Sequence, residues 1–290
     1  MTSDEGGWGC DSETGRLTDV LLCPPDNFRW LPTSAISRET LDSDRRFDHD
    51  AARAQHAELV SVYEAAGVRC RYLKPDPALP YQVFARDSSV MTPWGTIVTQ
   101  LKQWWRRGEY APVITFHQQS EIPIWRMVTA GALEGGDVMV VEPGVALIGT
   151  GEERTEIAAA RQLAGWFEAE GWEARVEPIP GVFVHIDVLV AIVAPRLAAV
   201  CTEVVSSGLV GWFRDKGFEI VEVSAADAWR LGVNAISLGS ERVLSGAGAR
   251  SLNEQLAARG LELLTPELEM FTLGGGGAHC LGQALRREPA

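Results

Sequence analysis

Four segments carry one pattern and decide the fold: RDSSVMTPWGTIVT (86–99), GDVMVVEPGVALIGT (136–150), IDVLVAIVAPRLAAV (186–200) and NAISLGSERVLSG (234–246). Each reads as a polar residue, an apolar run, a turn and a second apolar run, which is typical of paired strands. The polar anchors are Asp87, Asp137, Asp187 and Asn234, and they lie 50, 50 and 47 residues apart. A regular spacing of this length indicates a repeat architecture. The segment TDVLLCPPDNFRW, from Thr18, resembles a degenerate fifth copy.

Each strand pair is followed by a stretch of helix-forming residues and a further short apolar run. The predicted helices are Asp50–Ala66, Thr155–Glu170, Glu203–Lys216 and Arg250–Arg259. Five such units closed around an axis would bury what one unit leaves exposed, and 290 residues give about 58 per unit. We therefore predict an α/β fold, a fivefold pseudosymmetric β/α-propeller of ββαβ units. It would form one catalytic domain over residues 16–290, with residues 1–15 as a flexible tail. The alternative is an ordinary α/β sheet with coincidental spacing.

The composition describes an acidic protein with ample material for a core. Of 290 residues, 46% are apolar, and 39 acidic against 26 basic residues give a net charge of −13. This excludes disorder as the main state and argues against a nucleic-acid partner, which needs clustered Lys and Arg. No apolar run approaches the ~20 residues of a membrane-spanning helix, and the acidic start is unlike a signal peptide. We therefore expect no membrane association and a cytoplasmic location.

Cys280 stands out among five scattered cysteines, which contain no CxxC pair and so suggest neither a disulfide framework nor a zinc site. It ends the run Gly274-Gly-Gly-Gly-Ala-His-Cys280. Four consecutive glycines are costly in backbone entropy, which indicates a close approach that side chains would block. Cys280 is therefore a candidate nucleophile on a tight loop. The alternative is a buried cysteine after a glycine-rich hairpin.

Other polar groups begin the repeat units. His185 and Asp187 share one face of an apolar run, so the imidazole could act as a general acid and base beside a carboxylate. The Glu134-Gly-Gly-Asp137 segment could receive a cation, and Arg86-Asp87 opens the first unit. The alternatives are a core histidine with satisfied hydrogen bonds, a turn and a surface ion pair. In a closed ring these starts converge on one axis, as an active site requires. The remaining histidines lack metal-ligand spacing.

The order RD, EGGD, HxD and GGGGxHC, from about Phe84 onward, resembles the guanidino-modifying enzymes of the pentein fold. That superfamily includes arginine deiminase, dimethylarginine dimethylaminohydrolase and the amidinotransferases. The resemblance implies the same fivefold propeller that the repeat predicts independently. It also implies a small-molecule guanidino substrate and no metal or organic cofactor, and it leaves a homodimer open.

The resemblance assigns roles to particular residues. Cys280 matches the nucleophile, His185 the general acid/base, and Glu134 the carboxylate that pairs with this histidine and a substrate nitrogen. Asp87 and Asp187 match the carboxylates that grip the guanidinium, which is planar and suits bidentate acceptors. The residues that would hold the substrate α-carboxylate are Arg154 in GTGEERTE and Arg106 in KQWWRRGE, with Arg107 as a substitute for Arg106 and solvated surface charges as the alternative.

The implied reaction is hydrolysis of arginine, a methylated arginine or a related guanidino compound through a covalent thiouronium. The products would be a ureido compound and ammonia or an amine. An amidinotransferase, in which an amine replaces water, is the alternative, and a non-catalytic binding propeller is a third hypothesis. The short spacing between Glu134 and His185 is similar to that of the dimethylarginine hydrolases. Arg86 before Asp87 is similar to the deiminases and transferases, so the substrate stays open.

Overall fold

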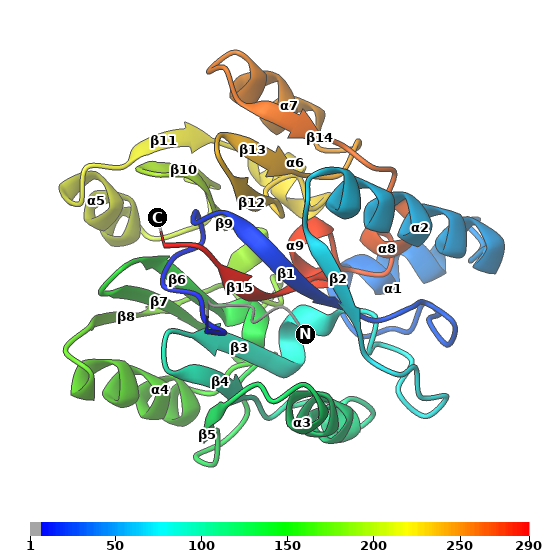
Figure 1. Ribbon diagram of the computed structural model, residues 1–290. Coiled ribbons are helices and arrows are strands. Elements are labelled where there is room, and N and C mark those ends of the chain that lie inside the picture. The colour runs from blue at the N-terminus through cyan, green and yellow to red at the C-terminus, as the bar shows by residue number, and fades with distance from the viewer. Residues whose placement is uncertain (1–6, 290) are drawn as a thin grey trace.

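The chain forms five three-stranded sheets over residues 7–289, the part that this computed structural model describes (Figure 1). In each sheet two strands form an antiparallel pair, and a third strand lies parallel to the middle one. Four sheets are continuous in sequence: β3 (Ser89–Thr92), β4 (Gly95–Val98) and β5 (Ile124–Met127); β6 (Val138–Glu142), β7 (Val145–Thr150) and β8 (Glu173–Pro178); β9 (Val190–Ala194), β10 (Leu197–Val200) and β11 (Glu219–Glu222); β12 (Ile236–Gly239), β13 (Arg242–Leu244) and β14 (Glu262–Leu264). The predicted fivefold pseudosymmetric propeller is confirmed.

The fifth sheet joins distant parts of the chain. Strand β1 (Leu17–Leu22) pairs antiparallel with β15 (Gln283–Arg287) and parallel with β2 (Arg69–Tyr72). The sequence suggested that the segment from Thr18 is a degenerate fifth copy of the strand pair. In the structure it does not form such a hairpin. It supplies the second strand of a unit whose first strand comes from residues 283–287, because the ring closes through this pair.

Most helices lie on the outside of the ring, whereas α9 (Ala278–Leu281) lies near its centre (Figure 1). The helices are α1 (Ala35–Asp42), α2 (His49–Ala65), α3 (Tyr110–Gln119), α4 (Ile157–Ala169), α5 (Ser207–Asp215), α6 (Ala225–Trp229), α7 (Arg250–Ala257), α8 (Glu269–Thr272) and α9 (Ala278–Leu281). The four predicted helices correspond to α2, α4, α5 and α7, with ends that differ by up to four residues. Within residues 7–289, no helix is both long and apolar enough to span a bilayer.

Helix α4 shows how such a helix is held. Its buried residues are Ala159, Ala160, Leu163, Ala164 and Phe167, which recur at the spacing of one helix face. They pack in a cluster with residues of β6 and β7, including Val138, Ala146 and Ile148. Burying a leucine or phenylalanine side chain fully contributes about 1.5–3 kcal/mol, so this face fixes the helix on its sheet.

The N-terminal segment is packed against the end of the chain. Gly9 bridges to Arg286, and the backbone N–H of Arg287 donates to the Gly9 carbonyl at 3.0 Å. The side chains of Cys10 and Ser12 are buried. The sequence predicted a flexible tail over residues 1–15, whereas residues 9–15 of the structure pack against the end of the chain. Residues 1–6 lie outside the described part.

Candidate active site

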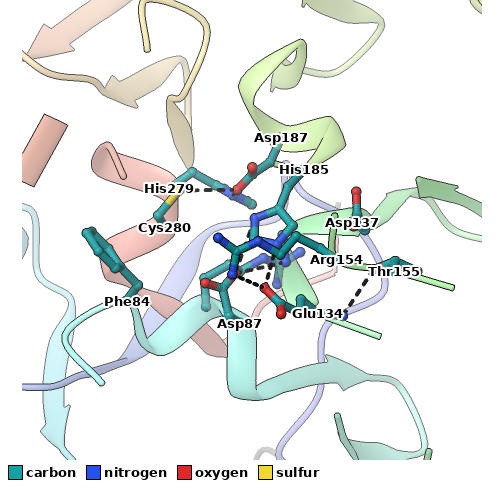
Figure 2. Close-up of polar contacts among 12 residues, drawn as sticks. Phe84, Asp87, Glu134, Asp137, Arg154, Thr155, His185, Asp187, His279 and Cys280 are labelled. Carbon is teal, nitrogen blue, oxygen red and sulfur yellow. Dashed lines mark hydrogen bonds and ion pairs between the residues drawn. The ribbon is translucent and has the colours of Figure 1, made fainter. Parts of the chain in front are cut away.

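Short helical turns before the first strands bring the polar anchors to the centre of the ring. They are η1 (Ala85–Ser88), η3 (Gly135–Asp137) and η4 (Ile186–Val188), which carry Asp87, Asp137 and Asp187. In the unit made from both ends of the chain, α9 takes the corresponding place before β15 and carries Cys280. Figure 2 shows these side chains gathered around one point, as the repeat predicts.

His185 lies between two carboxylates. Its Nε2 atom is 2.9 Å from Oε2 of Glu134, and its Nδ1 atom is 3.6 Å from Oδ1 of Asp87. All three side chains are buried. Burial disfavours the imidazolium, but Asp87, Glu134 and Asp137 outweigh that effect and raise the pKa of His185 to about 9. At neutral pH, therefore, His185 is a cation with a proton to give.

Glu134 is held as an anion. Burial raises the pKa of its carboxyl group, yet Arg154 and His185 overcome this effect and hold the pKa well below its usual range. Its Oε1 atom accepts from the Lys102 backbone N–H at 3.1 Å, and its own N–H donates to Thr155 Oγ1 at 3.1 Å. Both the charge and the position of this carboxylate are thus supported from several elements.

Cys280 is buried, and its Sγ atom lies 3.6 Å from Oδ2 of Asp187. Burial, followed by the charges of Asp187 and Asp87, raises the pKa of the thiol well above its usual value. The thiol is therefore protonated at neutral pH in this arrangement. Asn234 holds this loop, because its Oδ1 atom accepts from the backbone N–H groups of His279 at 3.0 Å and Cys280 at 3.3 Å.

Glycines of the GGGG and EGGD segments permit close approach of neighbouring side chains. A Cβ atom on Gly276 would strike the ring of Phe84, which packs beside the cysteine loop (Figure 2). A Cβ atom on Gly136 would lie 2.5 Å from Nδ1 of His185. These two positions explain why the EGGD and GGGG segments exclude side chains.

Acceptors for a guanidinium stand beside the thiol. Oδ1 of Asp187 is buried and has no hydrogen-bond partner within residues 7–289, although buried oxygens are usually paired. Asp87 lies close by, with its Oδ1 atom facing His185. Arg154 borders the same cavity, donates to the Thr33 carbonyl at 2.6 Å, and has its NH1 atom 3.6 Å from Oε2 of Glu134. Its buried Nε atom also lacks a partner in the described chain.

The contacts of Arg106 do not fit the predicted carboxylate anchor. Its guanidinium lies 2.8 Å from both oxygens of Glu109 and 2.7 Å from Oδ2 of Asp87, and it also donates to the carbonyls of Tyr81 and Phe84. Almost every N–H of the group is occupied. Arg106 is a buried ion-pair residue beside Asp87 that also borders the cavity with Cys280, so its role toward a substrate carboxylate stays a prediction. Arg107, the substitute, is exposed and donates to a backbone carbonyl.

The cavity that borders several of these groups is small. Its volume is about 20 Å³, which is room for about one water molecule, and it is bordered by Cys280, His185, Asp87, Arg106, Arg154 and segments 33–34 and 274–276. A larger cavity of about 580 Å³ lies between α1, α6 and α8, but neither Cys280 nor His185 borders it. The chemistry belongs to the smaller cavity.

Several residues of the site escaped sequence reasoning. Asn234 entered only as the fourth repeat anchor, although its alignment with three aspartates was a signal. Thr33 had no motif to mark it, and Thr155 entered only as part of GTGEERTE and as the start of a predicted helix. Glu13 fell in the supposed tail, and its side chain lies 3.7 Å from Nε2 of His279.

Asp87, Glu134 and His185 also have the spacing of a metal site. One ligand atom from each lies within 4.8 Å of the others, the one such group found among residues 7–289. An organic cation with N–H groups and a metal ion would both suit two carboxylates. Because His185 is protonated at neutral pH, it would have to lose its proton before it could bind a metal ion.

Comparison with known proteins supports the sequence interpretation. A profile of the family described as "N,N dimethylarginine dimethylhydrolase, eukaryotic" matches residues 27–287. The protein YkgA of Bacillus subtilis is 27% identical over 285 residues, which span 96% of this chain and 95% of YkgA.

Two solved structures share the fold. The N-terminal domain of ArgZ, an arginine dihydrolase from cyanobacteria crystallised with substrate, superposes with a TM-score of 0.82 at 19% identity, over 93% of this chain and 98% of that one. The dimethylarginine dimethylaminohydrolase (DDAH) of Pseudomonas aeruginosa, complexed with citrulline, gives 0.78 at 22% identity, over 92% and 99%. Fold and sequence together define a guanidino-modifying hydrolase of the pentein superfamily. Within that class, the chain belongs to the dimethylarginine dimethylaminohydrolase family.

Proposed function

We propose that the chain hydrolyses the guanidino group of arginine, a methylated arginine or a related compound, with Cys280 as the nucleophile. The observation that carries this proposal is a cavity bordered by Cys280 and His185, in which Cys280 contacts Asp187, a residue with one unpaired oxygen, and His185 contacts Glu134. The products are a ureido compound and ammonia or an amine. The family match supports the reaction class.

Substrate binding begins with charge. A guanidinium placed between Asp87 and Asp187 gives its N–H groups to carboxylate oxygens, and the free Oδ1 of Asp187 gains the partner that it lacks. The same cation lowers the pKa of the Cys280 thiol, which burial and two carboxylates had raised. The thiol releases its proton to water, so the nucleophile forms only when substrate is present.

The chemical steps follow from these positions. The thiolate forms a C–S bond to the central carbon, and the C–N bond breaks as His185 protonates the departing nitrogen. A thiouronium remains on Cys280. Water then gives one proton to His185 and adds to the same carbon. The C–S bond breaks, the sulfur of Cys280 takes the remaining hydroxyl proton, and the neutral ureido product leaves. Glu134 keeps His185 oriented and charged for the first transfer.

The far end of the substrate is assigned to Arg154. Both Arg154 and Arg106 border the cavity, but the Arg154 guanidinium is partly unpaired, whereas that of Arg106 is occupied. A carboxylate on the substrate would therefore pair with Arg154. In this proposal, a guanidino compound without a carboxylate is a poor substrate.

The test is a substrate panel of L-arginine, NG,NG-dimethyl-L-arginine and agmatine, which lacks the carboxylate. We expect citrulline with ammonia or dimethylamine from the first two, and a kcat/KM for agmatine lower by about tenfold or more. Cys280→Ser serves as the control and should lose about 10⁴-fold or more in rate. Equal turnover of agmatine would reject the role of Arg154. Ornithine that appears only with an added amine would favour the amidinotransferase, and full activity in Cys280→Ser would refute the nucleophile.

A further inference from the structure

Asp187 is held from behind by the residue next to the nucleophile. Nδ1 of His279 lies 2.8 Å from Oδ2 of Asp187, the same oxygen that faces Cys280 Sγ. The other oxygen of Asp187 is left free to face substrate. Figure 2 shows His279 and Asp187 side by side at the edge of the site. His279 thus decides which oxygen of Asp187 is available.

His279 is itself held by the N-terminal segment. Its Nε2 atom lies 3.7 Å from Oε2 of Glu13, and Glu13 Oε1 lies 3.6 Å from NH2 of Arg86. These side chains are largely buried, with 6% of His279 and 13% of Glu13 exposed. With a carboxylate near each ring nitrogen, only the imidazolium presents an N–H to both, because a neutral ring carries one N–H.

We propose that His279 is a positioning residue that fixes Asp187 as a charged partner, and that Glu13 completes the active site by holding His279. This inference rests on the proposed function for the role of Asp187. It makes residues 7–15, which precede the first strand of the propeller, part of the catalytic arrangement. Neither residue touches the reacting atoms.

The charge of His279 matters because of what surrounds the thiol. Cys280 faces Asp187 and Asp87, and both charges disfavour the thiolate. A fixed imidazolium beside Asp187 offsets one of them. Burial and Arg86 act against that imidazolium, but Asp187 and Glu13 prevail and raise the pKa of His279. The charged and titratable groups around this chain of contacts are Glu13, Arg86, Asp87, His185, Asp187, Cys280 and Arg287.

Two substitutions of His279 separate geometry from charge. In His279→Asn, the side-chain amide nitrogen falls near the place of Nδ1, so it can still donate to Asp187 without a charge. His279→Ala removes both the hydrogen-bond donor and the positive charge. Glu13→Gln keeps the shape of the Glu13 side chain and removes the negative charge near Nε2 of His279. Glu288→Gln is the matched control, because its exposed carboxylate in the same region pairs with Arg16 instead.

The measurement is the rate of Cys280 alkylation by iodoacetamide against pH, without substrate, with the modified residue identified by mass spectrometry. We expect the midpoint to rise by about one pH unit in His279→Asn, since an opposite charge within ~4–6 Å shifts a pKa by about 1–3 units. Glu13→Gln should shift it in the same direction by less, and Glu288→Gln not at all. For a substrate that the wild type hydrolyses, His279→Ala should also raise KM, whereas the KM of His279→Asn should stay close to that of the wild type.

The outcomes distinguish this inference from the function that it builds on. An unchanged alkylation midpoint in folded His279→Asn and Glu13→Gln overturns the inference, even if the wild type turns over substrate. Shifted midpoints with no turnover by the wild type reject the proposed function and leave the charge relation intact. If the variants fail to fold, histidine nitrogen NMR of the wild type decides, because a neutral His279 at pH 7 contradicts the proposal.

Discussion

Replacing Arg106 with methionine should destabilise the fold by about 3–5 kcal/mol at pH 8, the typical cost of removing one partner from a buried ion pair. The guanidinium is buried and lies 2.8 Å from both oxygens of Glu109 and 2.7 Å from Asp87. Methionine fills the space of the apolar stem. It leaves two buried carboxylates without the cation between them.

This loss should shrink as the pH falls. Burial raises the pKa of Glu109 to about 7, against the opposing effect of Arg106. A carboxyl group whose pKa is raised on folding binds its proton more tightly in the folded state. Its contribution to the free energy of unfolding is therefore present at low pH and is lost as the pH rises through the pKa of the folded state. In Arg106→Met that pKa rises further. The variant keeps a proton that the wild type releases, and its deficit grows by up to about 1.4 kcal/mol per pH unit above 7.

The assay is urea unfolding followed by tryptophan fluorescence at pH 6 and pH 8. Arg107→Met is the matched control, because its neighbouring guanidinium is exposed and should cost less than about 0.5 kcal/mol. A loss under about 1 kcal/mol at both pH values, together with a large rise in KM for a carboxylate-bearing substrate, would refute the reasoning. Arg106 would then be the substrate anchor that the sequence suggested.

Three further predictions concern the core, the acid and the glycine loop. Leu163→Ala in α4 should cost about 2–5 kcal/mol in urea unfolding, and a loss under 1 kcal/mol would show that the helix is not held through this face. The kcat/KM of the wild type should fall as the pH rises through about 9, because His185 then loses the proton it donates, and an unchanged alkaline limb in His185→Asn would contradict this. Gly276→Ala should push Phe84 and the cysteine loop apart and reduce kcat/KM at least tenfold, with circular dichroism to show that the fold persists; full activity would mean that the ring moves freely.

Much of the ring could be predicted because its signals are local. The anchors at 87, 137 and 187 stand one repeat apart, and each precedes a strand of the expected kind. Helix α3 was missed because YAPVITFHQQ contains proline and several β-branched residues, which are poor helix formers. Helix α3 forms despite this low helix propensity because the segment packs behind β4 in the ring.

The errors lie where sequence-distant segments meet. Nothing local indicates that β1 pairs with β15, and so Thr18 was read as the start of a fifth copy. Glu13 has no motif, and only the folded ring places it beside His279. Arg106 matched a family position, but its ion pair with Asp87, 19 residues earlier in the chain, becomes visible only in three dimensions.

The split unit also gives the chain an order of assembly. The carboxylates on η1, η3 and η4 leave the ribosome before Cys280, and the thiol joins them only when β15 pairs with β1. A nascent chain can therefore build most of the cation-binding groups while it still lacks a nucleophile. Joining the two ends by a linker and opening the β6–β7 turn would change that order. A permuted chain of this kind would make Cys280 before η1 and η3, although still after η4, with every sheet still able to form.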